Sequence, residues 1–260
     1  MGDLAEGLKS FWDERPCNSR HSRKIVGSDA YFYEVAKRRY TVEPHIPAFA
    51  EFEKWSGKRV LEVGCGIGTD AVSFALAGAQ VTAVDVSEKS LDLAGANACA
   101  HNMWDVEFLC ADAEQDLPLP ANHFDLLYSF GVLHHTPHPV QALRNAVRCL
   151  KPGGEARVML YARDSWKSAM IEARLDQPEA QAGCPLARQY TRTAAEVLLI
   201  DAGLEPVSVE QDHIFPYNVE AYAEGRLVKQ PWFEAMPSEV YGALRRRFGW
   251  HLLLRARKAA

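Results

Sequence analysis

The 260-residue sequence has no long apolar run and no excess of positive charge. None of its apolar runs approaches the ~20 residues that a membrane-spanning helix needs, so we expect no membrane span. Its 29 basic and 34 acidic side chains leave a net charge of −5, which gives no overall field to attract nucleic acid. A small molecule is therefore a better expected partner than a nucleic acid or a membrane interior.

The cysteines are few and scattered, and no Cys-x-x-Cys pair occurs among the six. This distribution argues against a disulfide framework and a zinc-cysteine site, so we expect free thiols and no bound metal. The N-terminal residues are acidic and mixed, without the basic region and apolar core of a secretory signal. Together these features predict a cytoplasmic protein.

Short apolar segments alternate with helical patterns through the middle of the chain, which predicts an α/β fold with a parallel sheet between helices. Strands are expected at 59–63, 80–85, 106–110, 123–130 and 155–161, with later strands near 206–210 and 250–255. Helices are expected at 30–40, 69–77, 88–100, 139–150 and 193–202, and Ser87 is a good N-cap for the third of these. We divide the chain into an N-terminal segment at 1–57, a core at 58–162 and a C-terminal part at 163–260. This last part holds a polar, irregular link at 163–190 and an aromatic insertion at about 213–245.

A glycine-rich turn follows the first predicted strand, in the stretch LEVGCGIGTD at 61–70. The dinucleotide fingerprint Gly-x-Gly-x-x-Gly would need glycine at position 69, which is Thr69, and no Gly-Lys-Ser/Thr phosphate loop is present. Glycine at 64 and 66 lets a ligand approach the main chain closely. The turn is therefore suited to a ligand that lies against the backbone but is not a dinucleotide.

Three acidic residues next to the predicted strand ends indicate the chemistry of that ligand. Glu62 would repel a pyrophosphate and suits an ammonium or sulfonium group. Asp85, at the end of the second strand, can accept hydrogen bonds from ribose hydroxyls. Asp112, after the third strand, can accept from the exocyclic amine of adenine. The implied ligand has an amino-acid end, a ribose and an adenine, with no phosphate.

With these residues in place, the sequence resembles the class I S-adenosylmethionine-dependent methyltransferases. The matching stretches are LEVGCGIGTD at 61–70, VTAVDVS at 81–87, CADA at 110–113, SFGVLHHTPHP at 129–139 and LKPGGEARVMLY at 150–161. They occur in the family's order and cover about half of the chain. The resemblance implies a Rossmann-like, seven-stranded, mostly parallel sheet with helices on both faces and an antiparallel last strand. It also implies S-adenosylmethionine as cofactor, with S-adenosylhomocysteine as product.

The resemblance assigns cofactor contacts residue by residue. It places the backbone of Gly64, Cys65 and Gly66 under the methionine portion, beside Glu62. Asp85 and Val86 would contact the ribose and the adenine face, and Asp112 and Ala113 the adenine edge. Ser129 or Phe130, at the tip of the fourth strand, would contact the amino-acid end.

Catalytic and substrate residues are harder to predict, because methyl transfer needs mainly alignment and a base only for a protonated nucleophile. His134 is a candidate general base, with packing in a loop as the alternative interpretation. Tyr33 is a second catalytic candidate, on the N-terminal segment that folds over the cofactor as a helical lid in this family. The substrate-binding candidates are Arg23, His135, Tyr190, His213 and Tyr217.

Several functions stay open at this stage. A methyltransferase for a small molecule is favoured, with an O, N, S or C acceptor undetermined, and the LHHTP stretch also resembles enzymes that methylate quinones and lipids. The run Arg245–Arg246–Arg247 is the best support for an RNA or protein substrate, although a solvated helix face explains it equally well. A non-catalytic cofactor-binding protein is the third alternative. The aromatic insertion is either a substrate cap or a homodimer interface.

Overall fold

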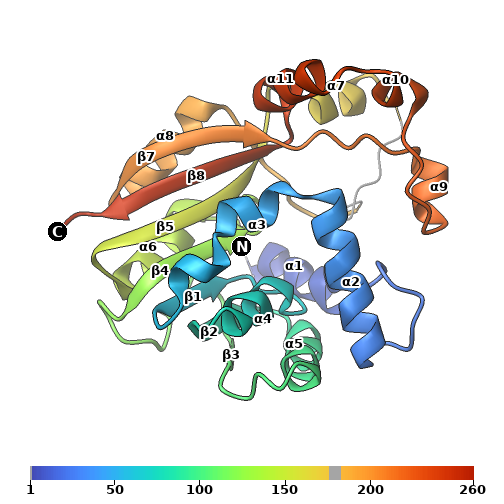
Figure 1. Cartoon of the computed structure of the whole chain (residues 1–260). Helices are drawn as coiled ribbons and strands as arrows, with labels where there is room; N and C mark the ends of the chain where they lie inside the picture. Colours follow the sequence, from blue (N-terminus) through green and yellow to red (C-terminus); the bar gives the residue numbers. More distant parts are fainter. Residues whose placement is uncertain (1, 176–182) are drawn as a thin grey trace.

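A computed structural model describes residues 2–175 and 183–260 and contains a mixed sheet between helical layers (Figure 1). The strands are β1 (Arg59–Val63), β2 (Gln80–Asp85), β3 (Glu107–Cys110), β4 (Phe124–Phe130), β5 (Leu150–Ala162), β6 (Gln189–Tyr190), β7 (Leu204–Asp212) and β8 (His251–Lys258). Seven of them follow the order β3-β2-β1-β4-β5-β8-β7, in which β8 is antiparallel to both of its neighbours. The predicted α/β class and the antiparallel last strand are therefore confirmed.

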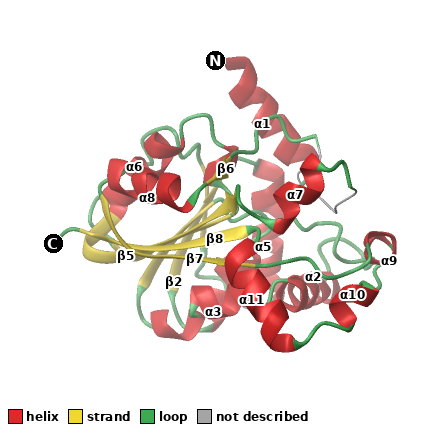
Figure 2. Ribbon diagram, turned by 90° about the horizontal axis from the view of Figure 1, so that it is seen from above, coloured by secondary structure: helices red, strands yellow, loops and turns green. Residues whose placement is uncertain are grey.

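Helices cover both faces of the sheet. They are α1 (Gly2–Glu14), α2 (Asp29–Val42), α3 (His45–Ala50), η1 (Phe52–Trp55), α4 (Thr69–Leu76), α5 (Glu88–Ala100), η2 (Leu133–His135), α6 (Pro139–Cys149), α7 (Trp166–Glu172), α8 (Arg192–Asp201), α9 (Val219–Ala223), α10 (Pro231–Glu234) and α11 (Ser238–Phe248). Figure 2 shows α6 and α8 on one side of the sheet and α3 on the other. Each face has its own apolar core, one built on α6 and α8 and the other on α3, η1 and α4.

The first strand is central to the sheet because it pairs with β2 on one side and β4 on the other, both in parallel. Its side chains alternate between the two cores: Val60 packs with the α3 side, and Leu61 and Val63 pack with the α6 side. The chain leaves β1 toward β2 in one direction and returns to β4 in the other. The carboxyl ends of β1 and β4 thus form the topological switch point at which open α/β sheets bind ligands.

A buried arginine holds the N-terminal segment against the sheet. Arg157 of β5 is fully buried, and its guanidinium donates to the backbone carbonyls of Phe49 and Ala50 at the end of α3. The same side chain forms ion pairs with Glu51 and Glu155. These partners satisfy the buried charge, so this arginine fixes the position of α3 relative to β5.

The structure differs from the sequence-based expectation in several elements. A short extra strand, β6, pairs with Tyr161 and Ala162 at the end of β5, beyond the point where β4 stops. The link expected to be irregular contains both β6 and α7, although its residues 176–182 lie outside the described part of the chain. Helix α1 has no counterpart among the expected helices. The insertion between β7 and β8 is helical, with α9, α10 and α11 along it.

Among the residues that the structure describes, no helix is long and apolar enough to cross a membrane.

Candidate active site

A cavity opens at the carboxyl ends of the first four strands. Its wall is built from the loops that follow β1, β2, β3 and β4, and α1 and α2 close it on the remaining side. The empty space, counted together with its open mouth, is about 1180 Å³.

Most of the predicted cofactor residues meet in this cavity. Nine of the ten line it: Glu62, Gly64, Cys65, Gly66, Asp85, Val86, Asp112, Ala113 and Phe130. The tenth, Ser129, is buried beneath the surface, where its hydroxyl donates to the Val63 carbonyl at 3.0 Å. Its position makes it a residue that joins β4 to β1 rather than a direct ligand contact.

The glycine turn can form only with glycine at its first position. Gly64 has a φ of +78°, and a Cβ placed on it would lie 2.1 Å from a methyl group of Val132 in the loop after β4. Gly66 has a φ of +53° and faces more open space. Left-handed backbone is costly for other residues. The turn is therefore tight at Gly64, against the β4 loop, and open at Gly66, where a ligand can approach.

Asp85 holds the turn from the neighbouring strand. One carboxylate oxygen accepts from the Gly66 backbone N–H at 2.8 Å, and the other accepts from the Ser87 backbone N–H at 2.9 Å. Burial raises the pKa of Asp85, while these backbone donors act in the opposite direction. Because a carboxylate oxygen can accept more than one hydrogen bond, Asp85 keeps acceptor capacity for a ligand.

Glu62 is a buried carboxylate with an unsatisfied oxygen. Its side chain is at the cavity wall, and its Oε2 atom has no hydrogen-bond partner among the described residues. Burial, helped by the nearby Asp70 carboxylate, raises the pKa of Glu62 well above its ordinary range, although Arg39 opposes the shift. A buried polar atom without a partner is costly, and a cationic donor at this position would remove the cost.

Arg39 is a site residue that the sequence did not reveal. It extends from α2 into the cavity wall, forms a 2.7 Å ion pair with the buried Asp70, and has an Nε atom without a partner among the described residues. Asp70 also accepts from the hydroxyls of Tyr40 and Tyr128. An arginine fixed in this way is suited to bind a carboxylate. Nothing in the local pattern of α2 distinguishes Arg39 from its neighbours, and only the packing of α2 on the turn does.

Helix α1 contributes a second set of residues that the sequence did not predict. Leu8, Lys9 and Trp12 line the cavity, and Asp13 accepts a 2.7 Å hydrogen bond from the Ser87 hydroxyl. The signal that could have found this helix is its amphipathic spacing of apolar residues. The N-terminal segment thus does lie over the predicted cofactor site.

The remaining candidates lie away from the cavity. Tyr33 is 66% exposed on the outer side of α2, and Arg23 donates to the carbonyl of Glu224, which follows α9. The backbone of Tyr217 pairs with that of Lys229 in an isolated antiparallel β-bridge inside the insertion. Tyr190 lies on β6, and His213 lies just after β7. Tyr33 was predicted from helical spacing, which does not reveal which side of a helix faces the sheet, and Arg23 was predicted from a polar cluster before that helix.

The two adjacent histidines are in different environments. His134 is fully buried under Tyr161, with 3.7 Å between ring centroids, and does not line the cavity. His135 does line it, and its Nδ1 lies 2.6 Å from the Leu186 carbonyl. A carbonyl there requires Nδ1 to carry the proton, which leaves Nε2 as an acceptor. Burial lowers the pKa of His135 to about 4, so its ring is neutral at pH 7.

Comparison with known proteins agrees with this geometry. A family model described as "Methyltransferase domain" matches residues 61–158, the stretch that contains the glycine turn and all four strand-end loops of the cavity. Residues 61–158 thus match a methyltransferase domain, which supports the predicted resemblance to class I methyltransferases.

Two curated methyltransferases share sequence with the domain. The chain is 37% identical over 99 residues to a ubiquinone biosynthesis O-methyltransferase of Bordetella bronchiseptica, covering 38% of this chain and 41% of that protein. It is 32% identical over 157 residues to the 27-O-demethylrifamycin SV methyltransferase of Amycolatopsis mediterranei, covering 60% of this chain and 57% of that protein. The matches thus span less than two thirds of either relative.

Solved structures support the fold of the methyltransferase domain. The crystal structure of the Burkholderia thailandensis 1,6-didemethyltoxoflavin-N1-methyltransferase, with bound S-adenosylhomocysteine, has a TM-score of 0.57 and 19% sequence identity. The similarity covers 100% of this chain and 90% of that one. At this identity the likeness establishes a shared architecture.

Proposed function

We propose that this methyltransferase domain transfers a methyl group from S-adenosylmethionine to a small-molecule acceptor. The observation that carries the proposal is the buried Glu62 carboxylate, whose Oε2 lacks a partner among the described residues, at the wall of a cavity beside the glycine turn. A cofactor with an ammonium group would satisfy it. A phosphate-bearing nucleotide would meet a repulsive negative charge at the same place.

The other cavity residues fit the remaining parts of this cofactor. Arg39 offers a cationic donor for the amino-acid carboxylate, next to Glu62 for the ammonium group. Asp85 has acceptor capacity for ribose hydroxyls, and Asp112 can accept from the adenine amine. When bound, S-adenosylmethionine supplies a methyl carbon activated by its positively charged sulfur. No metal or further cofactor is part of this proposal.

The chain's own contribution to methyl transfer is positioning and exclusion of water. The apolar side chains of Leu8, Trp12 and Phe130 line the cavity and offer no hydrogen-bonding groups to water, apart from the indole N–H of Trp12. Where the acceptor group carries a proton that must be removed, we propose that His135, rather than the predicted His134, accepts it. His135 lines the cavity, and the Leu186 carbonyl fixes the tautomer in which Nε2 can accept.

A hydroxyl on a small molecule is the acceptor that we favour. Both curated relatives are named for methylation at oxygen, and the cavity is apolar over much of its wall. A macromolecular acceptor is less well supported, because Arg245 forms an ion pair with Asp212 at 3.1 Å and so contributes less to a cationic surface. The net charge of −5 acts in the same direction.

A methyl-transfer screen tests the proposal. The purified chain and S-adenosylmethionine would be incubated with pools of phenols, aliphatic alcohols, quinols, thiols and amines, and release of S-adenosylhomocysteine would be measured. We expect release with one hydroxyl pool, and less release from an Asp85→Asn variant when the cofactor concentration is below its Kd for that variant. RNA and peptide pools would be tested in the same way. If the chain binds the cofactor but no pool of either kind gives release, a non-catalytic cofactor-binding protein would be favoured. No cofactor binding at all would refute the proposal.

A further inference from the structure

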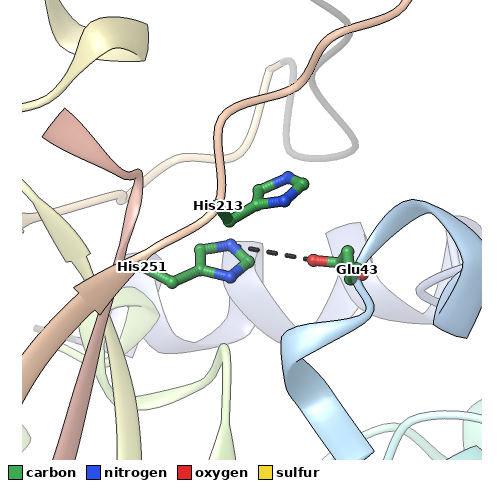
Figure 3. Close-up of side chains that lie close together, drawn as sticks. All are labelled: Glu43, His213 and His251. Atoms are coloured by element: carbon green, nitrogen blue, oxygen red, sulfur yellow. Dashed lines mark ion pairs between the residues drawn. The ribbon is translucent and has the colours of Figure 1, made fainter. Parts of the chain in front are cut away.

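A cluster of histidines lies beside the cavity but outside it. His251 begins β8, His213 follows the end of β7, and Glu43 lies at the junction between α2 and α3. Figure 3 shows the two imidazoles extending from the neighbouring strand ends toward the glutamate. The three residues come from distant parts of the sequence, and neither the cofactor site nor the proposed methyl transfer uses them.

The potential ligand atoms of these three side chains converge. One carboxylate oxygen of Glu43 and one ring nitrogen each of His213 and His251 lie within 4.8 Å of one another. His251 Nε2 is already 3.7 Å from Glu43 Oε1. In a tetrahedral zinc site with ligand bonds of about 2.0–2.2 Å, ligand atoms are roughly 3.4 Å apart. The ligand atoms would therefore have to move closer to one another by at most about 1.4 Å when a metal binds.

A fourth residue orients one of the ligands. The Nε2 atom of His45 lies 2.8 Å from Nδ1 of His251. When His251 donates through Nδ1, its Nε2 carries a lone pair that faces the Glu43 carboxylate. In this tautomer two acceptor atoms lie 3.7 Å apart and can share one cation, whereas in the other tautomer the Nε2–H of His251 faces the carboxylate. Metal-binding histidines usually donate their second ring nitrogen to a carboxylate, a backbone carbonyl or a water, and here the acceptor would be the imidazole of His45.

The surroundings keep the imidazoles neutral, as metal binding requires. His45 and His251 are buried, and burial lowers the pKa of His45 to about 3 and that of His213 and His251 well below the ordinary value. Arg39, Arg245 and Lys167 are the cationic groups nearby, and Arg39 forms an ion pair with Asp70. Arg245 is compensated by its ion pair with Asp212, and Lys167 lies over the ring of Trp250.

The backbone at His213 supplies a further, independent observation. This residue has a φ of +74°, in the left-handed region that non-glycine residues seldom adopt. Its carbonyl accepts a 2.7 Å hydrogen bond from the Trp250 N–H, which fixes the strained backbone against the start of β8. Such strain occurs most often where a side chain must be held in a functional position. Here it holds the ring of His213 stacked on that of His251, 4.8 Å between centroids.

We propose that Glu43, His213 and His251 bind one divalent transition-metal ion, zinc in the first place. Two imidazole nitrogens and one carboxylate oxygen are a common zinc ligand set, with a fourth position left open. Magnesium and calcium prefer sites made only of oxygen ligands. The metal would join α2, which helps to cover the cavity, to the ends of β7 and β8. This proposal does not depend on the methyl-transfer activity.

Metal binding can be measured directly on the full chain without an affinity tag. The protein would be stripped with a chelator, dialysed, and titrated with Zn²⁺ by calorimetry, with bound metal measured by elemental analysis. We expect one zinc per chain and a higher melting temperature when zinc is present. With Co²⁺ as a spectroscopic probe, we expect the intense visible bands of a four-coordinate nitrogen–oxygen site.

Variants distinguish this site from adventitious binding. Glu43→Gln and His213→Ala should each weaken zinc binding at least 100-fold, and His45→Ala, which removes the orienting partner, by about 10–100-fold. His101→Ala, at the end of α5, is the matched control and should bind as the wild type does. Circular dichroism would verify that each variant is folded. No stoichiometric zinc in the wild type, or equal affinity in Glu43→Gln and wild type, would overturn the proposal. Zinc binding without methyl transfer would support it and count only against the proposed function.

Discussion

Replacement of Glu62 by glutamine tests the centre of the cofactor site. The substitution keeps the shape of the side chain and removes its charge. In the cofactor-free protein it removes a buried carboxylate whose Oε2 has no partner among the described residues, so the free energy of unfolding should stay equal or rise. In the complex it removes the partner of the cofactor's ammonium group, so affinity should fall.

The magnitude follows from the type of interaction that is lost. A hydrogen bond to a charged group contributes about 1.5–3 kcal/mol, which corresponds to a roughly 10- to 150-fold weaker Kd. Calorimetric titration of both proteins with S-adenosylhomocysteine measures this difference. An unchanged Kd in a folded Glu62→Gln variant would mean that the ammonium group binds elsewhere, and would refute the placement of the cofactor.

The same residue predicts how cofactor affinity depends on pH. Burial raises the pKa of Glu62, so over the pH range between its ordinary pKa and the raised one the folded chain holds a proton that the unfolded chain has lost. This group's contribution to stability therefore falls as pH rises through that range. An ammonium group at Glu62 lowers the pKa again, so binding should release a proton and affinity should increase with pH. Titrations in buffers of different ionisation enthalpy would detect the release, which Glu62→Gln should lack.

Three further substitutions test other parts of the site, and Gly153→Ala is a control for one of them. Asp85→Asn should weaken S-adenosylhomocysteine binding by about 1–3 kcal/mol, measured by calorimetry, and unchanged affinity would contradict a ribose contact. Gly64→Ala should lower the free energy of unfolding by about 2–4 kcal/mol in urea, through backbone strain and a Cβ 2.1 Å from a Val132 methyl group. Gly153→Ala, where φ is +73° and no atom lies within 4 Å, should lose only about 1 kcal/mol, and equal losses would argue against the steric explanation. His135→Gln should reduce kcat about 10²- to 10⁴-fold with a hydroxyl acceptor while cofactor affinity stays the same, and a normal kcat would exclude it as the base.

The strands of the central sheet could be predicted from the sequence because the patterns that specify them extend over only a few residues. The strand Arg59–Val63 and the strand Gln80–Asp85 have the predicted bounds, and Ser87 caps α5 through a hydrogen bond from the Ser90 N–H. Buried parallel strands are short apolar runs, and caps and glycine turns act over a few residues. Because the carboxyl ends of parallel strands share one edge of a sheet, the strand pattern alone is enough to place Glu62, Asp85 and Asp112 together.

Tertiary packing alone decided which side chains from the lid and the C-terminal half reach a site. Arg39 contributes to the cavity and Tyr33 does not, because α2 packs one side on the turn and exposes the other. Glu43, His213 and His251 meet only because β8 is inserted antiparallel between β5 and β7 and brings its first residue to the end of β7. The sequence by itself determined the edge of the sheet at which we propose that the cofactor binds, because the acidic residues and the glycine turn there belong to short local patterns. The long-range order of the strands and the docking of the N-terminal helices determined the rest, because no short-range pattern encodes contacts between distant segments.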